Sequence, residues 1–305
     1  MKKVLLLGRS GAGKSSMRSI IFSNHAAQDS VRLLPTMDVE YTNFQFLENL
    51  MVNLWDCGGQ DNFMHDHIFN HREHIFSNVT LLVYVFDVVI TGHRIDRDEF
   101  YFRLCIEALA EYSSEAKVYC LMHKMDLIPD EMREELVHKR TRRLAALSSP
   151  FDPIVHATTI WNESLHAAWS KIVHALIPRI DSLVPHLERF CELVGADEVV
   201  LFERKTFLEI ASVVRRAHPD GNRLVKISGI VKHFRLNCAN RLGTTFESLM
   251  IRRNPYSLYV CNLTQHSYVM VVLSDRAVLP GGMELHLAVA RKYFEKLEIF
   301  SSPYS

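Results

Sequence analysis

Residues 8–15 read Gly-Arg-Ser-Gly-Ala-Gly-Lys-Ser and follow directly on the apolar run 4–7. This spacing of glycines, lysine and serine is the pattern of a phosphate-binding loop. A buried strand would end at Gly8 and a helix would begin near Ser15, so that backbone N–H groups and the positive end of the helix face the same space. The loop restricts this part of the chain to an α/β fold and predicts that it binds a nucleoside triphosphate.

Two side chains of the loop carry distinct chemistry. Lys14 would reach the β- and γ-phosphates, and the Ser15 hydroxyl would complete the coordination shell of a Mg²⁺ ion. The nucleotide contacts that we predict from the loop and the segment after it are Arg9, Ser10, Gly11, Gly13, Lys14, Ser15, Ser16 and Ser30.

Short apolar runs alternate with amphipathic stretches through the first half of the chain, which is typical of βαβ units with a mostly parallel, doubly wound sheet. The predicted strands are 3–7, 41–47, 51–55, 80–87, 118–122 and 154–157, and the predicted helices are 14–23, 98–112, 130–148 and 163–177. Pro178 and Pro185 bracket 179–184, and we place the domain boundary there, near residue 180.

The pattern changes beyond that boundary. A helix (183–194), two strands (198–203 and 206–213), a helix (224–242), three strands (244–251, 256–263 and 267–273) and a last helix (284–300) are expected. This order predicts an α+β domain with an antiparallel five-stranded sheet and helices packed on it. No catalytic constellation is visible in this half, which we interpret as a binding or dimerisation platform.

Composition limits the classes of function. With 305 residues the chain is long for one domain, so two domains, 1–180 and 181–305, are expected. The 35 Lys and Arg residues balance 35 Asp and Glu residues, which argues against a primary binder of nucleic acid. The six cysteines are scattered without a C-x-x-C pair, which fits free thiols in a reducing compartment.

The sequence also predicts that the chain does not insert into a membrane directly. No apolar run reaches the ~18 residues that crossing a bilayer requires. We find no signal peptide, myristoylation site or C-terminal prenylation box. If the protein works on a membrane, we expect a partner to hold it there.

Two further segments suit a triphosphate and its metal ion. In Asp56-Cys57-Gly58-Gly59-Gln60, which follows the predicted strand 51–55, Asp56 could hold Mg²⁺ through water and the Gly59 N–H could reach a γ-phosphate. Gln60 would then orient an attacking water. The Thr36 hydroxyl, between the first helix and the second strand, could ligate Mg²⁺ only when the γ-phosphate is present, which predicts a switch segment.

The segment His123-Lys124-Met125-Asp126 follows the predicted strand 118–122 and suits a guanine base. Small GTPases carry N-K-x-D here, and Asp126 preserves the acceptor for the guanine N1 and N2 donors, whereas adenine would leave that carboxylate unpaired. His123 replaces the usual Asn, so the contact that Asn makes is altered. In Thr158-Thr159-Ile160, after the last strand of this half, a backbone N–H would meet guanine O6, and Ile160 would form a hydrophobic lid.

This set of motifs, in this order, resembles the Ras-like GTPases over residues 1–178. Several segments resemble the Rag (yeast Gtr) GTPases more closely, and the similarity covers essentially the whole chain. Those segments are 35–40, 55–61, the His-Lys-Met-Asp motif, 159–163, 196–204 and 268–272. The Gly-Gly-Gln motif and the Thr-Met-Asp-Val-Glu segment resemble the A/B class.

The resemblance implies a Ras-like P-loop GTPase domain followed by a roadblock (longin-like) domain. It implies an obligate heterodimer with a C/D-type Rag chain, paired through the roadblock domains and held on the lysosome or vacuole by a lipidated scaffold complex. In its GTP state such an A/B-type subunit recruits the target-of-rapamycin kinase complex in response to amino acids. GTP hydrolysis to GDP is slow until a GAP supplies an arginine in trans, and an exchange factor reloads the protein.

Two other functions stay open from the sequence. One is a scaffold that holds GTP with negligible turnover; the other is a solitary trafficking GTPase. Intact Gln60, Thr36 and Ser15 favour a cycling switch, with Gln60, Lys14 and Thr36 as the catalytic residues. The large second half and the lack of lipidation signals argue against a solitary GTPase.

A histidine cluster follows Gln60. His67, His71 and His74 would share one face of a helix, with His65 nearby, a spacing that can bind zinc. No cysteine accompanies them, and we interpret the segment as a polar switch helix with exposed histidines.

Overall fold

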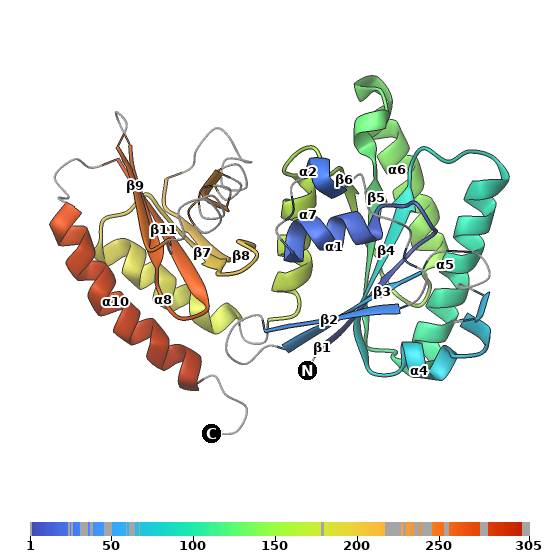
Figure 1. The fold of residues 1–305 in the computed structure, drawn as a ribbon, viewed down its shortest axis with the longest axis horizontal. Coiled ribbons are helices and arrows are strands. Elements are labelled where there is room, and N and C mark those ends of the chain that lie inside the picture. The colour runs from blue at the N-terminus through green and yellow to red at the C-terminus, as the bar shows by residue number, and fades with distance from the viewer. Residues whose placement is uncertain are drawn as a thin grey trace. The chain divides into compact units, whose positions relative to one another are not determined.

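The computed structural model describes residues 2–23, 25, 27–30, 36, 39–45, 51–58, 60, 65–66, 68–177, 180–216, 227, 230–232, 234, 238, 246–252, 256–274 and 280–300. The chain divides into two compact units, the first made of 1–44 with 51–168 and the second of 45–50 with 169–305. Each unit contains one sheet (Figure 1). The predicted domain boundary near residue 180 stays a prediction.

The sheet of the first unit has six strands in the order β2-β3-β1-β4-β5-β6. Their bounds are β1 (Lys2–Leu7), β2 (Val39–Gln45), β3 (Met51–Cys57), β4 (Val79–Asp87), β5 (Lys117–His123) and β6 (Ile154–Thr158). β1 pairs in parallel with β3 and β4, and the pairs β4–β5 and β5–β6 are also parallel. The predicted mostly parallel α/β sheet is confirmed, and the carboxyl ends of five strands meet at one edge.

Helices connect these strands, as parallel pairing requires. They are α1 (Lys14–Phe22), α2 (Ala27–Ser30), α4 (Arg72–Phe76), α5 (His93–Tyr112), α6 (Asp130–Leu147) and a 3₁₀ turn η1 (Met125–Leu127), and α7 (Ser164–His174) follows the last strand. In Figure 1, α1 lies on one face of the sheet and α5 and α6 lie on the other. α5 begins five residues before the predicted start at 98, directly after Gly92.

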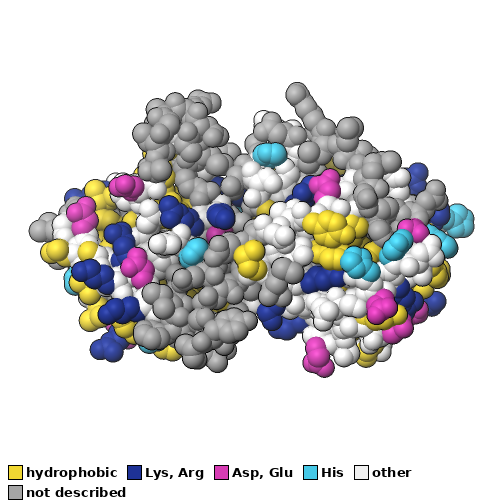
Figure 2. All heavy atoms as spheres, turned by 60° about the horizontal axis from the view of Figure 1, so that its bottom comes forward, with side chains coloured by type: hydrophobic (Ala, Val, Ile, Leu, Met, Phe, Trp, Pro, Cys, Tyr) yellow, Lys and Arg dark blue, Asp and Glu magenta, His cyan; other side chains and the backbone are white. Residues whose placement is uncertain are grey.

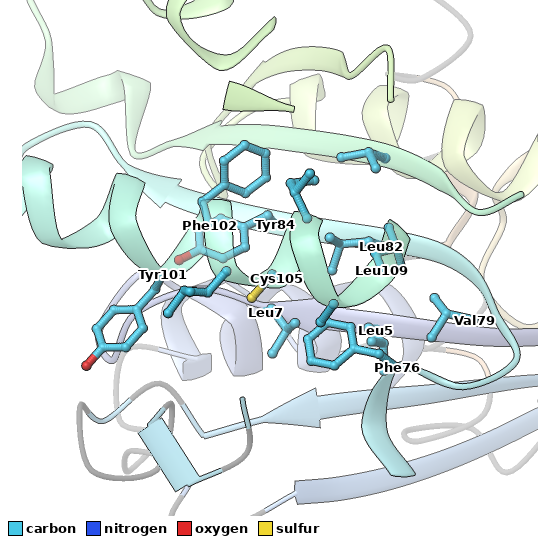
Figure 3. Packing of buried hydrophobic residues seen from close by; sticks show 14 of the residues in the cluster. Leu5, Leu7, Phe76, Val79, Leu82, Tyr84, Tyr101, Phe102, Cys105 and Leu109 are labelled. Atoms are coloured by element: carbon cyan, nitrogen blue, oxygen red, sulfur yellow. The ribbon is translucent and has the colours of Figure 1, made fainter. Parts of the chain in front are cut away.

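The core of this unit lies between the central strands and α5. Leu5 and Leu82 meet Phe102 and Leu109 of α5, and each of these side chains is completely buried (Figure 3). The Tyr84 ring packs edge-on against Phe102 at 5.0 Å between centroids. These continuous apolar strands therefore fix the sheet through packing on α5, and the sheet in turn places the loops at its edge.

The second unit contains an antiparallel sheet with strand order β8-β7-β11-β10-β9, which confirms the predicted five-stranded α+β fold. The strands are β7 (Glu198–Glu203), β8 (Glu209–Val214), β9 (Ser248–Arg252), β10 (Ser257–Asn262) and β11 (Ser267–Leu273), and the helices are α8 (Ile180–Leu193) and α10 (Pro280–Phe300). Most of the predicted helix 224–242 lies outside the described residues. None of the described helices combines the length and the apolar composition that a bilayer crossing requires.

Two details of this unit correct the sequence predictions. α8 begins at Ile180, three residues before the predicted start at 183, and Pro185 lies inside it. Pro185 removes one helical N–H, but tertiary packing outweighs that loss. β8 begins at Glu209 rather than Thr206, because the Glu203 carboxylate accepts the N–H groups of Lys205 and Thr206 and holds them in a turn.

We expect Phe102→Ala to lower the free energy of unfolding of the first unit by about 3–5 kcal/mol, because it removes a completely buried ring and leaves a cavity. Phe100→Ala is the matched control, since the Phe100 side chain is 47% exposed on the same helix. Urea unfolding of both variants measures the difference. Equal losses would contradict the packing described here.

Candidate nucleotide-binding site

The loop between β1 and α1 is shaped by two glycines. Gly8 has φ +139°, and a Cβ atom there would lie 2.4 Å from the carbonyl oxygen of Val85, so only glycine lets β1 end this close to β4. Gly13 has φ +98° and precedes the first residue of α1. The loop therefore turns directly from a buried strand into a helix, which is the geometry predicted for phosphate binding.

Lys14 occupies the centre of this loop. Its side chain is 95% buried, and its Nζ donates to the carbonyl oxygens of Gly8 at 2.7 Å and Arg9 at 3.1 Å. Burial lowers the pKa of Lys14, while the negative charge of Asp56 opposes that shift. The loop therefore holds an ammonium group at the place where anionic phosphates would enter.

Three oxygen-bearing side chains predicted as metal ligands meet beside Lys14. Ser15 Oγ and Thr36 Oγ1 are 2.6 Å apart. Asp56 is completely buried at the end of β3, and its Oδ1 has no hydrogen-bond partner among the described residues. Burial raises the pKa of Asp56, and Lys14, the Ser15 hydroxyl and Arg18 oppose the rise. Hydroxyl and carboxylate oxygens are the donors that Mg²⁺ prefers, so these residues fit the ion.

His123 lies between the phosphate-binding loop and β6. It is 97% buried at the end of β5, its Nδ1 is 3.0 Å from Thr158 Oγ1, and a Cβ atom on Gly13 would lie 2.8 Å from its ring. Burial lowers the pKa of His123 to about 4, and the Lys124 charge acts in the same direction. The ring is therefore neutral at pH 7 and packs against the glycine that opens α1.

Asp126 is held by a side chain of the turn after β6, a turn for which the sequence predicted only a backbone contact with the base. Thr159 Oγ1 donates to Asp126 Oδ1 at 2.5 Å, and Lys124 Nζ is 2.6 Å from Asp87 Oδ2. A cavity of about 770 Å³ opens beside Asp126 and Thr159 and also has Trp161 in its wall. The sequence places Thr159 in the predicted Thr158-Thr159-Ile160 turn, but nothing in it indicates that the Thr159 hydroxyl contacts Asp126.

The other residues predicted to contact the nucleotide do not all lie together. Ser16 Oγ donates to the Ser30 carbonyl oxygen at 3.5 Å, which brings those two predicted residues together. Arg9 directs Nη1 to the carbonyl oxygen of Arg94 at 3.3 Å, at the start of α5. Ser10 and Gly11 are exposed at the loop tip, and Ile160 is half-buried. Gly59 lies outside the described residues, while Gln60 is half-buried after β3; its catalytic role stays a prediction.

Two described histidines of the predicted cluster contact aromatic rings. Figure 2 shows histidine side chains next to exposed hydrophobic side chains. The His65 ring lies 4.5 Å from that of Phe69, the His74 ring lies 5.4 Å from that of Trp55, and His71 Nδ1 lies 3.2 Å from an Asp66 oxygen. His67 is outside the described residues. Among those described, no group of three or more His, Cys, Asp or Glu residues is arranged to hold a metal ion.

Comparison with known proteins assigns the family. The family model described as "Gtr1/RagA G protein conserved region" matches residues 3–231. This chain belongs to the Gtr1/RagA family of small GTPases. It is 43% identical to "Ras-related GTP-binding protein A" of Dictyostelium discoideum over 295 residues, which cover 97% of each chain. It is also 43% identical to "GTP-binding protein gtr1" of Schizosaccharomyces pombe, covering 96% of this chain and 95% of that protein.

The comparison also separates the two classes of Rag chain. The chain is only 26% identical to "Ras-related GTP-binding protein C" of Mus musculus, over 69% of this chain and 53% of that protein. The identity and coverage are both higher for the A and Gtr1 proteins. This Rag chain is therefore of the A/B type, as its Gly-Gly-Gln motif predicts.

We expect His123 to make the fold of this Rag protein less stable in acid. Its pKa is about 4 in the folded chain but about 6.5 when unfolded, so only the unfolded chain takes up the proton as pH falls through 6.5. Lowering the pH from 7.5 to 5 is therefore expected to reduce the free energy of unfolding by about 2 kcal/mol. The His123→Asn variant should not show this reduction.

Urea unfolding at the two pH values, with saturating GDP, measures this effect. His93→Asn is the matched control, because the His93 side chain is fully exposed. An identical pH dependence in the wild type and His123→Asn would show that this ring is not the source.

Proposed function

We propose that this protein is a guanine-nucleotide-dependent switch, the A/B-type subunit of a Rag heterodimer. In its GTP state it recruits and activates the target-of-rapamycin kinase complex in response to amino acids, on the cytoplasmic face of the lysosome or vacuole. The observation that carries the nucleotide part is the convergence of Lys14, Ser15, Thr36 and the unpartnered Asp56 oxygen at one edge of the sheet.

The triphosphate end of the site is built from these groups. Lys14 and the loop N–H groups would stabilise negative charge on the γ-phosphate. Ser15, Thr36 and Asp56 would hold Mg²⁺, and that ion supplies further neutralisation of phosphate charge. Gln60 would orient the attacking water. The hydrolysis products are GDP and inorganic phosphate.

The base end of the site selects guanine. The Asp126 carboxylate accepts from Thr159 with one lone pair of Oδ1, which fixes its plane and leaves acceptor capacity on both oxygens for the base. Guanine offers N1–H and N2–H donors to such a carboxylate, whereas adenine would leave it without a donor. The Ile160 backbone N–H is proposed to meet guanine O6.

The switch would act through Thr36. The Thr36 hydroxyl reaches Ser15 in the structure, so it lies where an ion bound between the loop and the γ-phosphate would be. Thr36 would ligate Mg²⁺ only while the γ-phosphate is present, so loss of that phosphate would release the Thr36 hydroxyl. The segment that carries Thr36 would then relax, and the surface offered to partners would change.

Membership of the family is the basis for the proposed partners. We propose a C/D-type Rag chain as the heterodimer partner, joined through the roadblock-like second unit, whose five-stranded sheet supports this assignment. A lipidated scaffold complex would hold the dimer on the membrane. A GAP would supply an arginine in trans, raising hydrolysis by roughly 10³–10⁵ on the scale known for other GTPases, and an exchange factor would reload GTP.

Gln60→Leu is expected to lower GAP-stimulated GTP hydrolysis by about 10²-fold or more without loss of GTP binding, because it removes the group that orients water. Single-turnover release of phosphate measures the rate. Gln265→Leu, on the turn between β10 and β11, is the matched control. Wild-type turnover in Gln60→Leu would favour a different water-orienting group, and no turnover in the wild type with a GAP would favour the GTP-holding scaffold.

Co-purification with a C/D-type Rag chain tests the heterodimer. We expect a stoichiometric complex that retains guanine nucleotide, with Ser15→Asn losing GTP because it changes a Mg²⁺ ligand. A stable nucleotide-loaded monomer would instead support a solitary GTPase and contradict the heterodimer.

A further inference from the structure

One guanidinium group joins three elements beside the proposed metal site. Arg18 lies on α1, and its Nε donates to Asp56 Oδ2 at 3.1 Å, at the end of β3. Its Nη1 donates to Thr42 Oγ1 at 3.3 Å, and its Nη2 pairs with Glu40; both of these partners are on β2. The Arg18 side chain is 22% exposed, so most of it is withdrawn from water.

The contact with Asp56 fixes the direction of a buried carboxylate. A fully buried carboxylate is unfavourable unless it is paired. Arg18 takes Oδ2, and Oδ1 is left without a hydrogen-bond partner among the described residues. The guanidinium is planar with donors in fixed directions, so it restrains the rotation of the carboxylate that it binds.

The other two contacts reach the strand that follows the switch residue. β2 begins at Val39, shortly after Thr36, and Glu40 and Thr42 are both within it. The Arg18 guanidinium therefore binds both Asp56 and β2. β2 is the strand that follows the segment with Thr36. The sequence pattern of nucleotide-binding motifs does not include this arginine.

We propose that Arg18 is a positioning residue that aims Asp56 Oδ1 at Mg²⁺ and couples that carboxylate to the strand after Thr36. This rests on the proposed nucleotide switch. The charge of Arg18 by itself predicts the opposite role, a weakening of Mg²⁺ binding. A cation beside Asp56 would repel Mg²⁺ and compete with it for the carboxylate. The two roles predict opposite changes in Mg²⁺ affinity when Arg18 is replaced.

The experiment loads the full chain with a fluorescent N-methylanthraniloyl nucleotide and varies free Mg²⁺ in EDTA-buffered solutions. It measures the half-retention concentration, which is the Mg²⁺ concentration at which half of the nucleotide stays bound. With the diphosphate, Arg18→Gln is expected to raise this concentration 10–100-fold, the range found when residues that orient metal ligands are replaced. Arg103→Gln is the matched control, because Arg103 forms an exposed pair with Glu107 on α5. Without Mg²⁺, Arg18→Gln and wild type should release nucleotide at the same rate.

Glu40→Gln tests the second contact separately. It leaves the Arg18–Asp56 bond in place, so we expect no change with the diphosphate and a rise in the half-retention concentration with a non-hydrolysable triphosphate. Arg18→Lys keeps the charge but loses the planar fork, and an increase close to that of Arg18→Gln is expected; this variant carries the test if Arg18→Gln does not fold.

An unchanged or lowered half-retention concentration in the Arg18 variants would overturn the positioning role. An unchanged triphosphate value in Glu40→Gln would overturn the coupling to β2. If the wild type retained nucleotide equally with and without Mg²⁺, the proposed metal-dependent switch itself would fail, which is distinguishable from failure of Arg18 alone.

Discussion

A carboxylate and an ammonium group are buried near the ends of two neighbouring strands: Asp56 on β3, and Lys14 at the start of α1, after the loop that follows β1. Neither charge is favourable in such a place alone. Each opposes the effect of burial on the other, since Asp56 counteracts the fall in the pKa of Lys14 and Lys14 counteracts the rise in the pKa of Asp56. The parallel pairing of β1 and β3 therefore creates a site that an anionic phosphate and a divalent cation can complete.

The base end depends on a different kind of contact. His123 connects the glycine before α1 with Thr158 at the end of β6, and its burial keeps the ring neutral. A neutral ring can pack against the loop without adding positive charge beside Lys124. The loop that would surround phosphates and the turn that would surround guanine are thus both contacted by one side chain, His123.

Much of the fold was predictable because its signals are local. The phosphate-binding loop and the strands β1, β4, β7 and β11 follow from short apolar runs and glycine spacing, and their predicted bounds agree with the structure to within one residue. The start of α5 and the place of Pro185 were not predictable in the same way. The residues of 93–97 are mostly exposed and extend α5 by one turn ahead of its buried part, which begins at Asp98, so the apolar pattern does not mark them. The packing of α8 outweighs the missing N–H of Pro185.

The sequence by itself determined the class of site: a strand, a glycine-rich loop with Lys14 and Ser15, and Asp126 in a base motif, all of which depend on residue type and spacing along the chain. Only the tertiary structure decided which groups serve those residues. Thr159 holds Asp126, His123 packs on Gly13, and Arg18 holds Asp56, across separations of 33, 110 and 38 positions. Such pairs form because parallel strands bring their carboxyl ends to one edge, and that proximity is a property of the sheet rather than of any short segment.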